Sequence, residues 1–213
     1  MTQVGRVYGG RSEAERRADR RQRLEDAGLA LFGTVGWSGA SIERLCQVAA
    51  VATRSFYEEY ETREHLLRAV YDRLVTEATQ LCLDAVAKAP HDLEARTRAG
   101  LGTYVRFLTD DPRRALVVSS EARSTPLMKS DRAAALAGFA AHIQSETRSL
   151  RRRSDAGDRT IALALAGAVS EVLADWVQQP EPRPDVEPIV GELTRLFVAA
   201  LTPGEELREE QAG

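Results

Sequence analysis

The chain has 213 residues, of which 43% are hydrophobic, and a formal net charge of -3. This length allows one large domain or two small ones, and the acidic balance excludes a protein covered with nucleic acid. No apolar run is expected to cross a bilayer, and the arginine-rich start lacks the apolar segment of a secretory signal. Two widely separated cysteines are typical of a reducing compartment, so we expect a cytoplasmic protein.

Positive charge is concentrated at the beginning of the chain. Residues 1–23 contain seven arginines and three acidic residues, so the remaining residues are acidic on balance. A basic arm on an acidic body favours a local contact with phosphate. A solubilising tail is the alternative. The glycine-containing residues 1–10 are expected to be a mobile arm.

A first helix is predicted from Ser12, a favourable N-cap, to Gly36. Its apolar residues recur at helical spacing along one face, at Leu24, Gly28, Leu31 and Val35. This stripe predicts a helix with one face in the core.

Two short helices follow, separated by a tight turn at residues 50–52. Ser41 is expected to cap the first of them, and the second covers Thr53–Tyr57. The inward face of the first consists of Ile42, Leu45, Cys46 and Ala49. Two helices joined in this way are typical of a helix-turn-helix, which places its second helix in the major groove of DNA.

The rest of the chain reads as longer helices, with no strand pattern. The expected ranges are 62–88, 93–109, 113–122, 131–153, 158–178 and about 185–201. The helix at 158–178 is apolar almost all round, which indicates cover from more than one side and favours a partner subunit. We therefore expect an all-α protein of about nine helices that forms a homodimer through residues 158–201.

The ordered spacing of residues 20–70 resembles the TetR family of transcriptional regulators. The residues that carry this resemblance are Leu24, Ala27, Ala30-Leu31-Phe32, Gly36-Trp37, Ser41, Leu45-Cys46, Ala50-Val51-Ala52, Phe56-Tyr57, Tyr60, Thr62-Arg63-Glu64 and Leu66-Leu67. The resemblance implies a DNA-binding domain at residues 1–63. It also implies a helical ligand-binding and dimerisation domain at residues 64–213.

Candidate DNA-binding residues lie at helix starts in this unit and just after it. They are Ser41, Arg44, Thr53, Arg54, Ser55, Tyr57, Tyr60 and Arg63. Arg54 is suited to a bidentate contact with guanine, whereas the tyrosine hydroxyls and Arg63 can reach phosphate. The expected partner is a palindromic operator in double-stranded DNA.

The sequence departs from the family pattern at two places. Ala50 stands at the turn glycine and Ala52 at the capping serine, so Thr53 is expected to cap the next helix. Glu58 and Glu59 would repel phosphate if they faced DNA.

The resemblance also implies a pocket for an unidentified small-molecule effector. Candidate lining residues are Tyr104, Phe107, Phe139, His142 and Trp176. Ligand binding would move the helix at 62–88, which both parts share, and change the spacing of the two recognition helices. No metal or cofactor is expected.

Two other classes of function remain as alternatives. One is a family-like protein that has lost DNA binding and acts through protein partners, which Glu58 and Glu59 would favour. The other is an all-helical enzyme, although the three histidines are dispersed and no catalytic motif occurs. Cys46 is a candidate redox switch, but its inward position favours an inert thiol.

Overall fold

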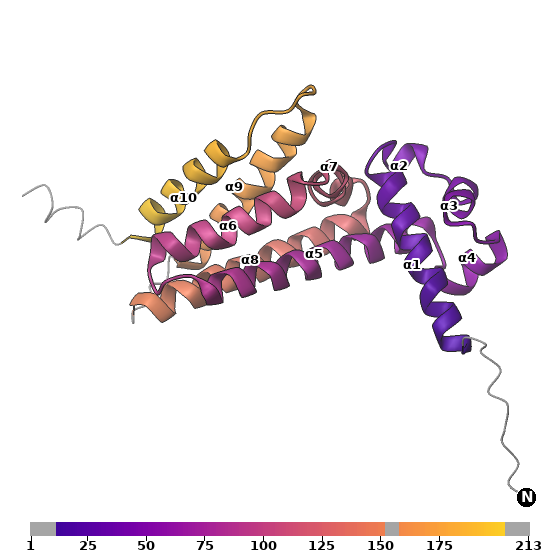
Figure 1. The fold of residues 1–213 in the computed structure, drawn as a ribbon, viewed down its shortest axis with the longest axis horizontal. Coiled ribbons are helices and arrows are strands. Elements are labelled where there is room, and N and C mark those ends of the chain that lie inside the picture. Colours follow the sequence, from indigo (N-terminus) through magenta and orange to yellow (C-terminus); the bar gives the residue numbers. More distant parts are fainter. Residues whose placement is uncertain (1–11, 152–157, 203–213) are drawn as a thin grey trace, which may run out of the picture.

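The computed structural model describes residues 12–151 and 158–202, and Figure 1 shows their arrangement. These residues form ten α-helices, one π-helical turn and one 3-10 turn, with no strand among them. The expectation of an all-α fold is confirmed. The arm predicted at residues 1–10 lies outside the described residues.

Four helices form a compact head at one end of the molecule (Figure 1). They are α1 (Glu13–Phe32), α2 (Gly36–Gly39), α3 (Ile42–Ala49) and α4 (Thr53–Glu59). Fully buried Phe32, Leu45 and Phe56 make the centre of the head, together with residues from the start of α5. Ser12 caps α1 in a reciprocal capping box with Glu15.

The first helix ends earlier than the sequence predicts. It stops at Phe32, and Val35, expected in the buried stripe, is exposed. Gly33 explains the break: a Cβ there would lie 2.4 Å from the Cβ of Arg113, so the chain can approach α7 only with glycine. Gly36 then has a positive φ of 69°, which a residue with a side chain rarely adopts.

The turn between α3 and α4 has the helix-turn-helix geometry without its usual residues. Ala50 takes a left-handed conformation with φ 51°, at a cost of about 1–2 kcal/mol relative to a right-handed one. The prediction that Thr53 caps α4 is wrong. Ala52 is the N-cap and offers no side-chain hydrogen bond, so Thr53 is the first helical residue.

The body begins with α5 (Arg63–Lys88), which is capped by Thr62 and leads from the head along the body. Helix α6 (Leu93–Thr109) returns beside it, and α7 (Pro112–Ala115) brings the chain back to the head. Leu81 of α5, predicted in the buried stripe, is exposed.

Two short turns join α7 to α8. The predicted helix at 113–122 is instead divided into α7, a π-helical turn η1 (Leu116–Ser120) and a 3-10 turn η2 (Glu121–Arg123). Helix α8 (Pro126–Arg151) begins five residues before the predicted start, because proline fits the first turn of a helix.

The last two helices, α9 (Asp158–Gln178) and α10 (Glu187–Leu201), have apolar side chains on the outside. Ile161 and Leu163 of α9 and Leu196 of α10 are exposed in the single chain. By length and composition alone, residues Arg159–Gln178 could cross a membrane, which corrects the expectation that no segment could. Such a helix is weak evidence for a membrane, because core helices have the same composition.

Candidate nucleic-acid interface and ligand cavity

Helix α4 presents polar side chains outward from the head. Phe56 is completely buried and anchors the helix, whereas Thr53, Arg54 and Tyr57 are exposed. The side chain of Arg54 is 92% exposed, and its Nε lies 3.5 Å from Glu58 one turn later. Ser55 is half-buried. The exposed face therefore offers a guanidinium, hydroxyls and an aromatic ring, which are groups that contact bases and phosphates.

The start of α3 is also exposed. Ser41 Oγ accepts a hydrogen bond from the amide of Arg44 at 3.2 Å, as an N-cap does. Arg44 Nη1 lies 3.4 Å from the carbonyl oxygen of Gly39, and its side chain is exposed. Exposed helix N-termini with a nearby cation are suited to phosphate.

Two predicted DNA-binding residues are instead engaged inside the head. Tyr60 is only 4% exposed, and its hydroxyl donates to Glu25 at 2.8 Å, which corrects its assignment as a phosphate ligand. Burial is the larger cause, and the hydrogen bond to Glu25 the smaller one, of a raised pKa of Tyr60. Arg63 donates to the carbonyl of Ala40 at 2.8 Å and stacks 3.8 Å from the Trp37 ring centroid, so it ties α5 to the head.

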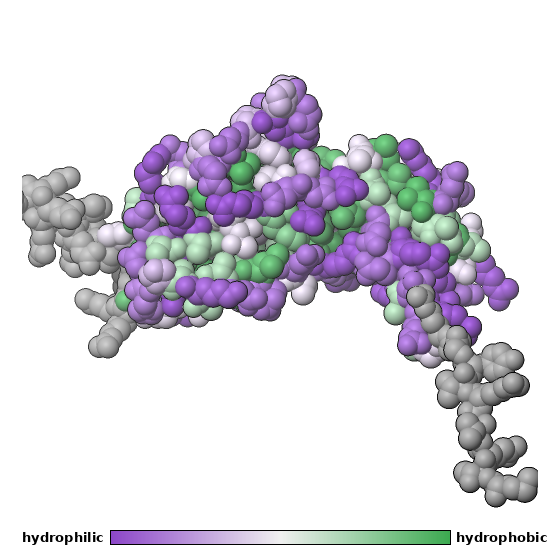
Figure 2. All heavy atoms as spheres, viewed as in Figure 1, coloured by the Kyte–Doolittle hydropathy of each residue, from purple (hydrophilic) through white to green (hydrophobic). Residues whose placement is uncertain are grey.

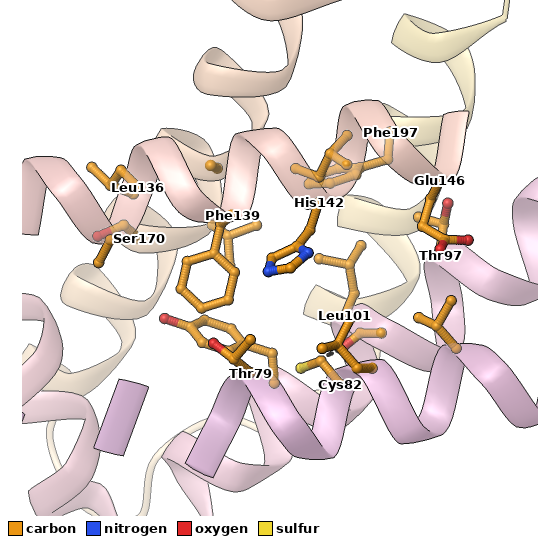
Figure 3. A pocket seen from close by; sticks show the side chains of 18 of the residues that line it. Thr79, Cys82, Thr97, Leu101, Leu136, Phe139, His142, Glu146, Ser170 and Phe197 are labelled. Atoms are coloured by element: carbon orange, nitrogen blue, oxygen red, sulfur yellow. Dashed lines mark hydrogen bonds between the residues drawn. The ribbon is translucent and has the colours of Figure 1, made fainter. Parts of the chain in front are cut away.

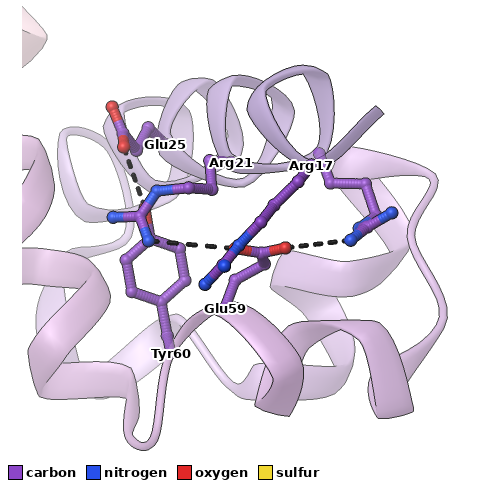
Figure 4. Close-up of polar contacts among 6 residues, drawn as sticks. Arg17, Arg21, Glu25, Glu59 and Tyr60 are labelled. Atoms are coloured by element: carbon purple, nitrogen blue, oxygen red, sulfur yellow. Dashed lines mark hydrogen bonds and ion pairs between the residues drawn. The ribbon is translucent and has the colours of Figure 1, made fainter. Parts of the chain in front are cut away.

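Glu59 has a different role from the one that the sequence implies. Its side chain is 1% exposed and turns toward α1, where Arg17 Nε and Arg20 Nη2 each donate to it at 3.0 Å (Figure 4). Arg21 lies 3.8 Å away. We call these four residues the arginine clasp. The clasp joins the end of α4 to α1 and leaves more positive than negative charge at the surface.

The expected repulsion of DNA by Glu59 is therefore not supported by its position. The carboxylate is buried and accepts two hydrogen bonds from cations, so it cannot face an approaching phosphate. Glu58 remains half-exposed beside Arg54.

The body encloses an apolar cavity with a volume of about 170 Å³. Its walls come from α5, α6, η1, α8, α9 and α10. Among the lining residues, Leu83 of α5 and His142 of α8 are exposed, so the cavity opens between these two helices. Hydrophobic residues are exposed among hydrophilic ones on the face of the body that Figure 2 shows.

Three of the five predicted ligand-contacting residues line this cavity. Tyr104 and Phe139 meet edge to face with ring centroids 5.3 Å apart, and the His142 ring points between the helices (Figure 3). The predictions for Phe107 and Trp176 do not fit the structure. Phe107 is buried under Arg114, and the Trp176 indole donates to the carbonyl of Pro184 at 3.0 Å, away from the cavity lining.

The head and the body are joined by a second contact besides α5. Glu121 of η2 accepts a hydrogen bond from the backbone amide of Trp37 at 2.7 Å. The side of Gly36 that would carry a Cβ lies against the same carboxylate. Gly33 of the head likewise packs on Arg113 of the body. Because Val118, three residues before Glu121, lines the cavity, this contact lies one turn from the ligand site.

The sequence reasoning missed Glu121 and the cavity residue Arg132, and it gave Glu59 a different role. Nothing in the local pattern distinguishes them from the charged residues of an ordinary helix surface. Glu121 meets a backbone amide 84 residues away, and only the fold brings the two together.

Both cysteines are free thiols. Burial raises the pKa of Cys46, and it raises that of Cys82 to about 12. These environments favour inert thiols over redox switches. Within the described residues, no group of three or more His, Cys, Asp or Glu side chains could hold a metal ion.

No protein-family model matches the chain, and no curated protein sequence matches it either. Solved structures do. FadR from Bacillus subtilis, solved in complex with stearoyl-CoA, superposes with a TM-score of 0.75 at 14% identity, over 84% of this chain and 98% of that one. A putative transcriptional regulator from Pseudomonas aeruginosa superposes with a TM-score of 0.73 at 19% identity, over 95% of this chain and 98% of that one. A TetR-like regulator from a Rhodococcus species superposes with a TM-score of 0.67 at 18% identity, over 90% of this chain and 98% of that one.

The chain therefore has the fold of bacterial transcriptional regulators with a helix-turn-helix head and a helical body. More particularly, the fold is that of the TetR-like regulators. The similar structures are regulators rather than enzymes.

Proposed function

We propose that this protein is a cytoplasmic, TetR-like regulator that binds operator DNA as a homodimer under the control of a small molecule. The observation that carries the proposal is the exposed face of α4, where Thr53, Arg54 and Tyr57 stand free of the head. This arrangement suits insertion into the major groove, with Ser41 and Arg44 at the neighbouring phosphates. The DNA-binding domain would comprise residues 1–63 and the remaining domain residues 64–213.

The homodimer is supported by exposed apolar side chains on the last two helices. Ile161, Leu163 and Leu196 would gain cover if α9 and α10 packed against the same helices of a second copy. Such a dimer would present two α4 helices about one DNA turn apart, roughly 34–36 Å, to successive major grooves.

Control by a small molecule is supported by the cavity and its position. An apolar cavity that opens between α5 and α8 is a natural ligand site. It is lined by α5, the first connection to the head, and by η1, which directly precedes Glu121 of the second connection. The similar regulator FadR was solved with stearoyl-CoA, so a ligand in the body of such a fold has a precedent. A ligand that prefers one arrangement of these connections would shift DNA affinity, and we expect release of the operator.

Binding to the DNA upstream of the protein's own gene tests the proposal. The full-length protein should bind this DNA, and the logarithm of the affinity should fall linearly with the logarithm of the salt concentration. Absence of binding at low salt would overturn the proposal and favour the alternative of a regulator-like protein that acts through protein partners.

A further inference from the structure

Most polar side chains in the middle of the cavity use their donors within the protein. Thr79 and Thr147 line it, but their hydroxyls donate to the carbonyls of Val75 and Ile143 at 2.7 and 2.8 Å. The thiol of Cys82 likewise turns to a backbone carbonyl of α6 at 3.5 Å. The imidazole of His142 points into the same region and is the exception among these side chains (Figure 3). The central part of the occupant is therefore apolar along most of its length.

The cavity is long relative to its volume. Its lining extends from Tyr71 to Val86 along α5 and from Arg132 to Leu150 along α8. At 1.5 Å per residue these stretches measure about 22 Å and about 27 Å. Since the volume is only about 170 Å³, the space is narrow. An unbranched chain fits this shape better than a fused ring system does.

Hydrogen-bond donors gather at the end nearest the head. Tyr71, Tyr104, Arg132 and Ser170 all line the cavity, and the charge of Arg132 acts on both phenols. Tyr104 lines the cavity, and burial raises the pKa of its hydroxyl. Ser170 lies at this end in Figure 3, whereas Glu146 and Thr97 lie at the other.

The two ends also differ in their ion pairs. At the far end, Arg96 donates to Glu146 at 2.7 Å. At the near end, Arg132 and Arg123 share the single carboxylate of Glu171, at 3.0 and 2.5 Å. Next to them, Asp131 and Asp72 share Arg68, and the charges of both carboxylates also act on Tyr71.

Arg132 has donor capacity to spare. Its Nη2 is engaged with Ser170 and Glu171 at 3.0 Å each, but its Nε is buried and has no partner. A buried guanidinium N–H without an acceptor is costly, and an anion would satisfy it. The Nε of Arg96 is in the same state, but its charge is already matched by Glu146.

We propose that the effector is an unbranched aliphatic carboxylate whose carboxylate group lies against Arg132, Tyr71 and Tyr104. Its chain extends along α5 and α8 toward Val86 and Leu150. This inference rests on the proposed function, because it names the ligand class of the same cavity. The buried position of the anionic group excludes a bulky head group such as coenzyme A at that end.

The same arginine provides a route to the DNA-binding head. A ligand carboxylate bound at the free Nε of Arg132 lies beside Glu171, whose carboxylate also holds Arg123 in η2. Two residues before Arg123, Glu121 accepts a hydrogen bond from the amide of Trp37. Ligand binding therefore acts next to the series of contacts that leads through η2 to the head.

Calorimetric titration of the full-length protein with decanoate, decan-1-ol and decanoyl-CoA tests the proposal. Decanoate should bind at least tenfold more tightly than decan-1-ol, which has the same chain without the charge. The Arg132→Gln variant should lose this preference while still binding decan-1-ol. The control variant Arg98→Gln, which changes an exposed arginine of α6 outside the cavity lining, should keep it. If Arg132→Gln does not fold, Tyr71→Phe/Tyr104→Phe removes only hydroxyls and should lower the preference at least threefold.

Three results would overturn the proposal: no binding of decanoate, equal affinity for decanoate and decan-1-ol, or tighter binding of decanoyl-CoA than of decanoate. None of these measurements uses DNA. A negative result here together with salt-dependent DNA binding would remove the ligand class alone. Decanoate binding without DNA binding would instead remove the regulator.

Discussion

The carboxylate of Glu121 accepts a hydrogen bond from the backbone amide of Trp37 at 2.7 Å. This contact joins η2, the turn before α8, to the short helix α2. Together with the continuous α5, it gives the head two connections to the body. A change in the body that alters one connection and not the other would rotate the head, which is what a ligand-controlled regulator requires.

Replacing Glu121 should loosen the head without unfolding the body. Glu121→Ala removes the acceptor of a part-buried amide, at a cost of about 1–2 kcal/mol. Hydrogen exchange at the Trp37 amide should accelerate in this variant. Glu121→Gln keeps an oxygen in place and is the matched control. Unchanged exchange in the alanine variant would show that the contact does not hold the head.

The arginine clasp should stabilise the head. Glu59→Gln removes the charge that Arg17 and Arg20 bind, and we expect the free energy of unfolding to fall by about 2 kcal/mol. Urea denaturation measures this loss. Glu58→Gln is the control, because its half-exposed pair with Arg54 is worth at most about 0.5 kcal/mol. Equal effects of the two substitutions would contradict a buried role for Glu59.

Arg54 should contribute to DNA binding and not to folding. Because its side chain is 92% exposed, Arg54→Ala should leave the melting temperature unchanged. Affinity for the operator should fall by about 1–3 kcal/mol, measured by fluorescence anisotropy with labelled DNA. Arg98→Ala removes an equally charged, exposed residue of α6 and should have little effect. Loss of affinity in both variants alike would indicate a general charge effect.

The outer face of α9 should determine the oligomeric state. Leu163→Asp places a charge where a partner helix is expected, so sedimentation should show a shift from dimer to monomer. Leu81→Asp is the control, since Leu81 is 41% exposed and Leu163 is 42% exposed, but Leu81 lies on α5. A monomeric native protein would remove the dimer from the proposal.

Neither thiol should react readily in the folded protein. Burial raises the pKa of Cys46 and Cys82, so less thiolate is present at pH 8 than in the unfolded chain. Each unit of the rise lowers the thiolate fraction about tenfold. Alkylation by iodoacetamide, followed by mass spectrometry, should be slower at both thiols in native than in denatured protein, and at least tenfold slower at Cys82. Rapid native labelling of Cys46 would restore the redox alternative.

Much of the head could be predicted from the sequence because its pattern is local. Helical spacing of Leu45 and Cys46 and the caps at Ser41 and Thr62 indicated α3 and the start of α5 correctly. Each depends on residues within about one helical turn, so the sequence alone contains the information. The same reasoning indicated the apolar helix at 158–178, which is α9.

The departures arose where distant segments meet. The hydroxyl of Tyr60 was expected to reach phosphate and Glu59 to repel it, but α1 supplies Glu25 and the arginines that bind these two side chains inside the head. The predicted single helix at 113–122 is instead divided at Leu116 and Glu121, and Glu121 meets the distant Trp37.

The sequence by itself determined most of the helical segments, and that α3, the turn and α4 form a helix-turn-helix, because periodicity and capping act over a few residues. The tertiary structure decided which charges are buried, where the cavity lies and how Glu121 reaches Trp37. These depend on contacts between residues tens of positions apart, whose partners no local pattern specifies.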